Sequence, residues 1–154
     1  MPLEKKTIAS NYPLPVYNYR VTSESLTLGF SEVSGLNLEY EPVTYKHGLS
    51  FAMGNKIIPG MRQPIKVTMK RGMVKGGDFL SSWIKGAYSD PFKSPKRDIL
   101  IDLCDEQGKP VIRWTVLGAL PTKIEAPIFT ATSNDVAIET MEVIAHGLEV
   151  DYNP

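Results

Sequence analysis

The chain has 154 residues, enough for one domain with its own hydrophobic core and too few for two ordinary domains. Lysine plus arginine total 17, and so do aspartate plus glutamate, so the formal net charge is zero. This balance argues against a dedicated nucleic-acid-binding protein, which usually carries a basic excess, and it leaves little repulsion between copies. A single cysteine excludes an intramolecular disulfide.

No apolar run is long enough to span a bilayer. Residues 1–12 are polar and lack the apolar segment of a secretory signal. We therefore expect the chain to be made and folded in the cytoplasm, without stable insertion into a membrane.

Residues 1–15 are interpreted as an N-terminal arm. Pro13 and Pro15 stand on either side of Leu14, and because proline fixes its own backbone angle and restricts the residue before it, this stretch is expected to be extended. The arm either packs on its own domain or reaches another molecule.

Alternation of apolar and polar residues then predicts half-buried β-strands, because successive side chains of a strand point to opposite faces of a sheet. The segments before residue 45 with this alternation are Tyr17–Thr22, Leu26–Ser31 and Leu36–Glu41. The Ser34-Gly35 pair predicts a turn or bulge before the last of them.

Residues 45–63 interrupt the alternation with three glycines and a proline, yet they also contain several large apolar side chains. The stretch is predicted to be a long inter-strand loop, whereas loops in compact domains have a median of about 4–6 residues. A long loop rich in apolar side chains must pack either on its own core or on another molecule.

A helix is predicted for Asp78–Tyr88, with Asp78 as its N-cap residue after two glycines. Apolar residues recur there at helical spacing and form one stripe: Phe79, Leu80, Trp83, Ile84 and Ala87.

The other strands predicted from alternation are Ile65–Lys70, a hairpin of Ile99–Leu103 with Val111–Leu120, and Val136–Val150 as one long strand or a bulged pair interrupted near Gly147. A second long connection is expected between Pro121 and Pro127. The sum is a single, mostly β domain with one helix, a small antiparallel β-barrel or sandwich.

The residues give no basis for catalysis. His47 and His146 are far apart in the sequence with no carboxylate at a ligand-like spacing, and Cys104 has no arranged base. No nucleophile elbow or phosphate-binding loop is present. We expect neither an enzyme nor a bound metal or cofactor.

Mixed charge marks the outward positions of two predicted strands. Glu39 and Glu41 are negative, whereas Lys66 and Lys70 flank Thr68 and are positive. If these strands are neighbours, opposite charges would pair across one solvated face. Such a face suits plain solvent exposure and equally the wall of a channel.

Motifs spread in order over almost the whole chain carry a family resemblance: Tyr12–Pro15, Phe30–Leu36, Glu41–Tyr45, Pro59–Pro64, Lys70–Gly72, Trp114, Pro121–Lys123 and Ala131–Glu139. In this order they resemble the tail-tube proteins of contractile injection machines, most closely the inner-tube subunits of phage-tail-like extracellular contractile injection systems. One position departs from the pattern, Asp135, where glutamate is more usual.

The resemblance implies a structural subunit that forms hexameric rings, which stack into a hollow tube. Contraction of a surrounding sheath propels the tube, which can carry cargo in its lumen. The implied partners are further copies of the chain, the sheath protein, the baseplate and tube-terminating proteins. Assembly is expected in the cytoplasm, followed by incorporation into an extracellular or cell-anchored particle, as either the repeated tube subunit or a specialised ring at its base.

If the chain forms such a tube, its residues offer three sets of candidate positions, of which the lumen-facing set is inferred only from alternation. The candidate inter-ring stacking loop contributes Tyr45, Phe51, Ile57, Ile58, Met61 and Arg62. The N-terminal arm is a second candidate contact, through Tyr12, Pro13, Leu14 and Pro15. The candidates for facing the lumen are Glu39, Glu41, Lys66, Thr68 and Lys70.

An alternative function is a stand-alone β-barrel module that binds a small ligand or a peptide. This function requires a concave pocket lined by aromatic side chains such as Tyr17, Tyr19 and Trp114.

Overall fold

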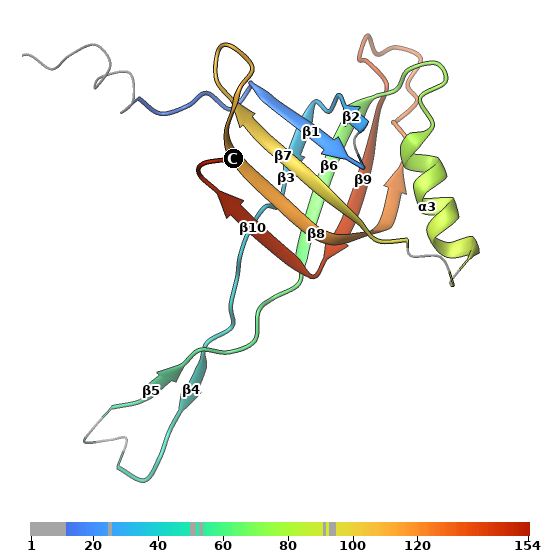
Figure 1. Cartoon of the computed structure of the whole chain (residues 1–154). Helices are drawn as coiled ribbons and strands as arrows, with labels where there is room; N and C mark the ends of the chain where they lie inside the picture. Colours follow the sequence, from blue (N-terminus) through green and yellow to red (C-terminus); the bar gives the residue numbers. More distant parts are fainter. Residues whose placement is uncertain (1–11, 25, 50–51, 53, 91, 93–94) are drawn as a thin grey trace, which may run out of the picture.

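The computed structural model describes residues 12–24, 26–49, 52, 54–90, 92 and 95–154, so that Phe51 lies outside the described residues. The strands are β1 (Tyr19–Ser23), β2 (Leu26–Leu28), β3 (Glu32–Ser34), β4 (Val43–Tyr45), β5 (Lys56–Ile58), β6 (Ile65–Gly72), β7 (Arg97–Cys104), β8 (Pro110–Glu125), β9 (Ile138–Ala145) and β10 (Gly147–Asp151). The helix is α3 (Phe79–Ser89), and Figure 1 shows it packed beside the strands.

The main sheet is antiparallel, with strand order β2-β1-β7-β8-β9-β6-β3, and β10 pairs with β8. The long strand β8 bends at Gly118: its first half pairs with β7 and β10, and its second half pairs with β9. Gly118 has a positive φ of 62°, and a Cβ there would lie 2.2 Å from the His146 ring, so this corner requires glycine. The bend folds the sheet into a sandwich, which confirms the predicted fold class.

The hydrophobic core fills the space between the two halves of the sandwich. The helix closes one side of it with Leu80, Trp83 and Ala87, all buried and all members of the predicted stripe. The Trp83 Nε1–H donates to the Pro95 carbonyl at 2.9 Å, which satisfies the indole donor. The buried core side chains are Val21, Ile65, Val67, Met69, Leu80, Trp83, Ile99, Ile101, Val116, Ala119, Met141, Val143, Ala145 and Leu148.

The structure differs from the predicted strand Leu36–Glu41 and from the predicted connection at Pro121. The segment Leu36–Glu41 is not a regular strand; the edge strand β3 lies just before it and ends at Ser34, and the next residue, Gly35, has a φ of +89°. The second correction is at Pro121, which lies inside β8 rather than in a connection. Proline donates no hydrogen bond, and the β8–β9 register slips between Pro121 and Lys123.

An antiparallel ribbon leads out of the sandwich from β3 and β6. The Gln63 N–H donates to the Glu39 carbonyl at 2.7 Å, Tyr40 bridges to Arg62, and β4 then pairs with β5. We call residues 39–62 the β-arm; Figure 1 shows it projecting away from the sandwich. The stretch 45–63, predicted as a loop, therefore contains β5 and the end of β4.

The ribbon depends on a close approach of its two backbones at Gly35. A Cβ at Gly35 would lie 2.1 Å from the Lys66 carbonyl oxygen, and its positive φ disfavours any other residue. We expect Gly35→Ala to lower the free energy of unfolding by more than about 1 kcal/mol. Gly29→Ala is the matched control, because nothing lies within 4 Å of a Cβ there. Thermal denaturation that found equal losses for both variants would contradict this account.

Candidate self-assembly surfaces

The β-arm exposes an unusual amount of apolar surface. Ile57 is 74% exposed and Met61 is 86% exposed. Other large apolar side chains of the β-arm are also exposed: Tyr40, Val43, Tyr45, Leu49 and Ile58. Full burial of one such aliphatic side chain is worth about 1.5–3 kcal/mol, and monomers rarely leave a patch of this extent in water. The β-arm therefore has the character of a contact surface for another molecule.

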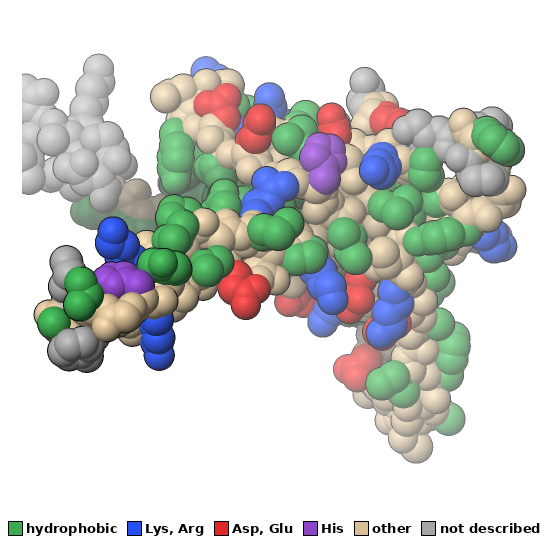
Figure 2. Space-filling model, turned by 90° about the horizontal axis from the view of Figure 1, so that it is seen from below, with side chains coloured by type: hydrophobic (Ala, Val, Ile, Leu, Met, Phe, Trp, Pro, Cys, Tyr) green, Lys and Arg blue, Asp and Glu red, His purple; other side chains and the backbone are tan. Residues whose placement is uncertain are grey.

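Beyond the two acidic residues at its base, Glu39 and Glu41, the β-arm is cationic. Residues 43–62 include Lys46, Lys56 and Arg62 and no aspartate or glutamate. Figure 2 shows Lys or Arg side chains on opposite sides of this projection, together with hydrophobic side chains. The β-arm therefore offers apolar side chains flanked by positive charge.

A second apolar protrusion lies in the connection between β8 and β9, residues 126–137. Ile128 is 93% exposed, Phe129 is 86% exposed and Val136 is 74% exposed. The sequence reasoning missed this surface, although an apolar pair directly after Pro127 in an otherwise polar stretch was a usable signal. Residues 126–137 include one acid and no lysine or arginine.

An apolar groove of about 400 Å³ opens between β3 and the sheet formed by β1, β7 and β8. Two of the three aromatic residues expected in a pocket line it, Tyr19 and Trp114, whereas Tyr17 is 76% exposed and is not among its described lining residues. The residues lining the groove are Val16, Tyr19, Ser31, Glu32, Val33, Leu36, Ile101, Leu103 and Trp114. We call this site the core groove.

Tyr19 is held in place at the core groove. Its hydroxyl donates to the Phe30 carbonyl at 2.6 Å. Burial raises the pKa of the Tyr19 phenol, and the nearby Glu32 carboxylate raises this pKa further, because both disfavour the phenolate. Tyr19 therefore acts as a neutral hydrogen-bond donor with its ring available to the groove.

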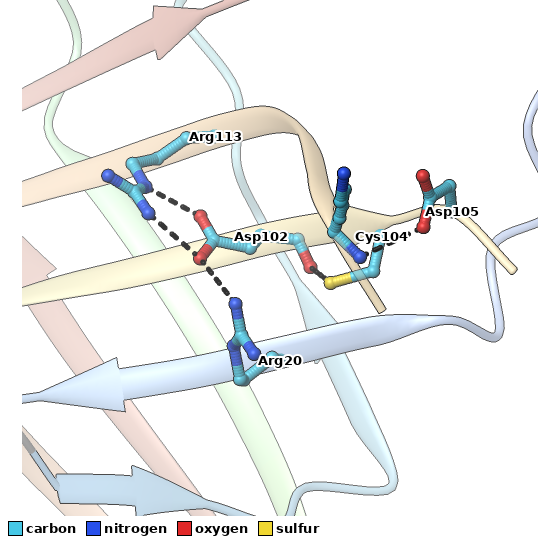
Figure 3. A network of polar contacts seen from close by, with 6 residues as sticks. Arg20, Asp102, Cys104, Asp105 and Arg113 are labelled. Carbon is cyan, nitrogen blue, oxygen red and sulfur yellow. Dashed lines mark hydrogen bonds and ion pairs between the residues drawn. The ribbon is translucent and has the colours of Figure 1, made fainter. Parts of the chain in front are cut away.

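An ion-pair network fixes the strands that form one wall of the core groove. Arg113 on β8 makes two hydrogen bonds to the carboxylate of Asp102 on β7, at 2.7 and 3.2 Å, and Arg20 on β1 lies 3.7 Å from the same carboxylate (Figure 3). Asp102 is buried between the two guanidinium groups. Because side chains alternate along a strand, the neighbouring residues Tyr19 and Trp114 face the opposite side of this sheet, towards the groove.

The predicted N-terminal contact residues lie along their own subunit. Tyr12, Pro13, Leu14 and Pro15 line a second groove of about 430 Å³ together with the tip of the β7–β8 hairpin, residues 104–107. The second groove adjoins the core groove, because two consecutive residues line them: Pro15 lines the second groove and Val16 lines the core groove. Its hairpin side includes the acidic residues Asp105 and Glu106.

The candidates for the lumen fall into two groups. Lys66, Thr68 and Lys70 share the outward face of β6. Glu39 and Glu41 instead lie at the base of the β-arm, where Glu41 accepts a hydrogen bond from the Gln63 side chain at 3.0 Å.

The condition for charge pairing between these two groups is not met, because their segments are not neighbours in the described structure. Lys70 pairs with Glu32 at 3.4 Å, because Glu32 lies opposite Lys70 in the β3–β6 register. The same ribbon places Glu39 opposite Gln63, several residues away from either lysine. The sequence pattern shows which positions of a strand carry charge, but it does not show which residues lie opposite one another on neighbouring strands.

The edges of the sandwich are a further feature of the surface. In the described chain, β2 and β3 end the strand order of the main sheet and β10 pairs only with β8. Each of these strands leaves one row of backbone N–H and C=O groups without a neighbouring strand, and such edges are templates for pairing with another chain.

No group of three or more histidine, cysteine, aspartate or glutamate side chains that could hold a metal ion occurs within the described residues. Cys104 is buried, with its Sγ 3.6 Å from the Asp102 carbonyl oxygen. In the part of the chain that the structure describes, no helix has the length and apolar character needed to cross a membrane.

Comparison with known proteins gives a family match and close structural matches. Residues 15–149 match the family model of the T4-like virus tail tube protein gp19. A chain of the PVC sheath–tube complex of an extracellular contractile injection system, in the extended state, is 30% identical, with a TM-score of 0.88 over 98% of this chain and 99% of that one. No curated protein sequence matches.

Two further solved chains are similar. One comes from the tube-terminating cap of the anti-feeding prophage, at 29% identity and a TM-score of 0.83, covering 92% of this chain and 93% of that one. The other comes from the PVC sheath/tube terminator in the extended state, at 30% identity and a TM-score of 0.84, covering 92% of this chain and 98% of that one.

Proposed function

The chain belongs to the family of T4-like virus tail tube proteins, and from this we propose that it is the structural subunit of the inner tube of a contractile injection system. Copies of the chain form hexameric rings, and the rings stack into a hollow tube that sheath contraction drives forward. Its partners are the sheath, the baseplate and tube-terminating proteins, and its lumen carries cargo. The chain performs no catalysis in this function.

The observation that carries the proposal is the surplus of contact surface on a single copy. The β-arm exposes large apolar side chains, and β2, β3 and β10 each have an unpaired edge within the described chain. Head-to-tail contacts around a ring would cover edges, and a second, non-closing contact along the axis would generate a filament. The family membership favours this function over a stand-alone binding module, although Tyr19 and Trp114 do share a groove.

The β-arm is the proposed inter-ring contact, through Tyr45, Ile57, Ile58, Met61 and Arg62. A stacking contact worth about 4 kcal/mol between two subunits corresponds to a dissociation constant of about 1 mM. Six such contacts made together between two rings approach the practical limit of non-covalent affinity of about 18–21 kcal/mol, even with substantial non-additivity. A modest patch on each subunit therefore suffices for a tube that withstands firing.

The outward face of β6, with Lys66, Thr68 and Lys70, is the proposed lumen surface, and Glu39 and Glu41 extend it into the base of the β-arm. Balanced charge without large apolar side chains would let a cargo slide rather than adhere. We place assembly in the cytoplasm, before the tube becomes part of an injection particle.

Negative-stain electron microscopy of the purified protein tests this function. We expect rings or rods with a central channel, alone or after addition of the sheath protein or the baseplate. Size-exclusion chromatography coupled to light scattering gives the mass of the soluble species. A monomer at high concentration that forms no rings with either partner would overturn the proposal.

A further inference from the structure

The core groove and the β-arm have complementary chemistry, and we propose that the core groove of one subunit binds the β-arm of a second copy. This inference rests on the proposed function, because it requires self-assembly. It assigns a receiving site to the exposed apolar side chains of the β-arm, centred on Ile57.

At the core groove, the described part of the subunit leaves the hydrophobic core partly uncovered. Helix α3 closes the sandwich over Val21, Met69 and Ile99, but the groove leaves Tyr19 and Trp114 only partly buried. Figure 1 shows the β-arm running away from the sandwich, so an arm that fills the groove comes from another copy. Every copy that offers one groove also offers one β-arm, so the numbers of sites match.

The subunit has an apolar protrusion in the β-arm and another at residues 126–137, and their charges indicate which of the two fits the core groove. The rim of the core groove includes Glu32, whose carboxylate also pairs with Lys70 at 3.4 Å, and the adjoining second groove includes Asp105 and Glu106. The outer part of the β-arm, residues 43–62, has Lys46, Lys56 and Arg62 and no acidic residue, so it complements this acidic border. Residues 126–137, which include Asp135 and no cation, do not.

Cross-linking between differently labelled copies tests the assignment. One protein has Val16→Cys at the groove and another has Ile57→Cys on the β-arm, both in a Cys104→Ala background. Val16 is 84% exposed, so its substitution leaves the core intact. The matched control replaces Ile57→Cys with Val136→Cys on the other protrusion, because Ile57 and Val136 are both 74% exposed. The pairs are mixed, assembled and treated with a short bismaleimide.

We expect a heterodimer band from Val16→Cys with Ile57→Cys and none from Val16→Cys with Val136→Cys. Adding Glu106→Lys to the groove partner should slow the first reaction by about 1.5- to 5-fold, the range expected for one exposed ion pair. Rings that form normally but give no band, or give one with Val136→Cys instead, would overturn the groove assignment and leave the tube function standing. Failure of every mixture to assemble would overturn both.

Discussion

Replacing Ile57 and Met61 together with aspartate is expected to abolish ring stacking while leaving the folded subunit intact. Both side chains are almost fully exposed, so their loss costs the isolated subunit no more than about 0.5 kcal/mol of unfolding free energy. In a stacked tube each charge would have to be buried without a partner, and six copies would incur this cost at once. Electron microscopy should show no rods, and circular dichroism should show an unchanged melting temperature.

The control for this variant is Ile57→Val with Met61→Leu, which keeps the β-arm apolar and of similar shape. We expect rods of normal length from the control. Rods from the aspartate variant would show that the β-arm is not the stacking contact. Loss of rods from the control as well would mean that assembly fails for a reason other than the buried charge.

Removing the carboxylate of Glu139 is expected to give a large loss of stability. Glu139 on β9 and Arg71 on β6 are both buried, and the Glu139 Oε1 lies 3.6 Å from the Arg71 Nε. The Arg71 Nε has no hydrogen-bond partner in the described structure. Glu139→Ala therefore leaves a buried guanidinium without its counter-charge, which costs about 3–5 kcal/mol.

The double variant Arg71→Met with Glu139→Leu distinguishes the free-energy cost of an unpaired buried charge from the cost of lost packing. It replaces both ions by apolar side chains of similar volume, and such replacements are neutral or stabilise by about 1–4 kcal/mol. Urea denaturation on the non-assembling β-arm variant measures the unfolding free energy without a contribution from assembly. A double variant as unstable as Glu139→Ala would mean that the ion pair itself holds β6 to β9.

Local patterns in the sequence predict the helix and several strands of this fold. The amphipathic spacing around Leu80 and Trp83 predicts the helix Asp78–Tyr88, and the structure has α3 at Phe79–Ser89. Alternation likewise predicts β6, whose residues alternate between buried and more exposed positions, and it predicts the β7–β8 hairpin, whose two strands pair in the structure. The order of motifs along the chain predicts the tail-tube family without any knowledge of the fold.

The strands of the β-arm cannot be predicted from such local patterns. Its strands have no alternation to read, because both faces are exposed in the single subunit. Their pairing continues the ribbon that leaves the sandwich from β3 and β6. A free two-stranded ribbon has no buried face of its own, so its apolar content is explained by a partner rather than by the fold.

Only the tertiary structure decided which residues share a site. Val16, Leu36 and Trp114 are distant in sequence, and they meet in the core groove because β8 bends at Gly118 and brings two halves of one sheet face to face. Strand register likewise determines that Lys70 pairs with Glu32 rather than with Glu39 or Glu41. Alternation and helical spacing record which face of an element is buried, whereas register and topology depend on contacts between distant segments, which no local pattern contains.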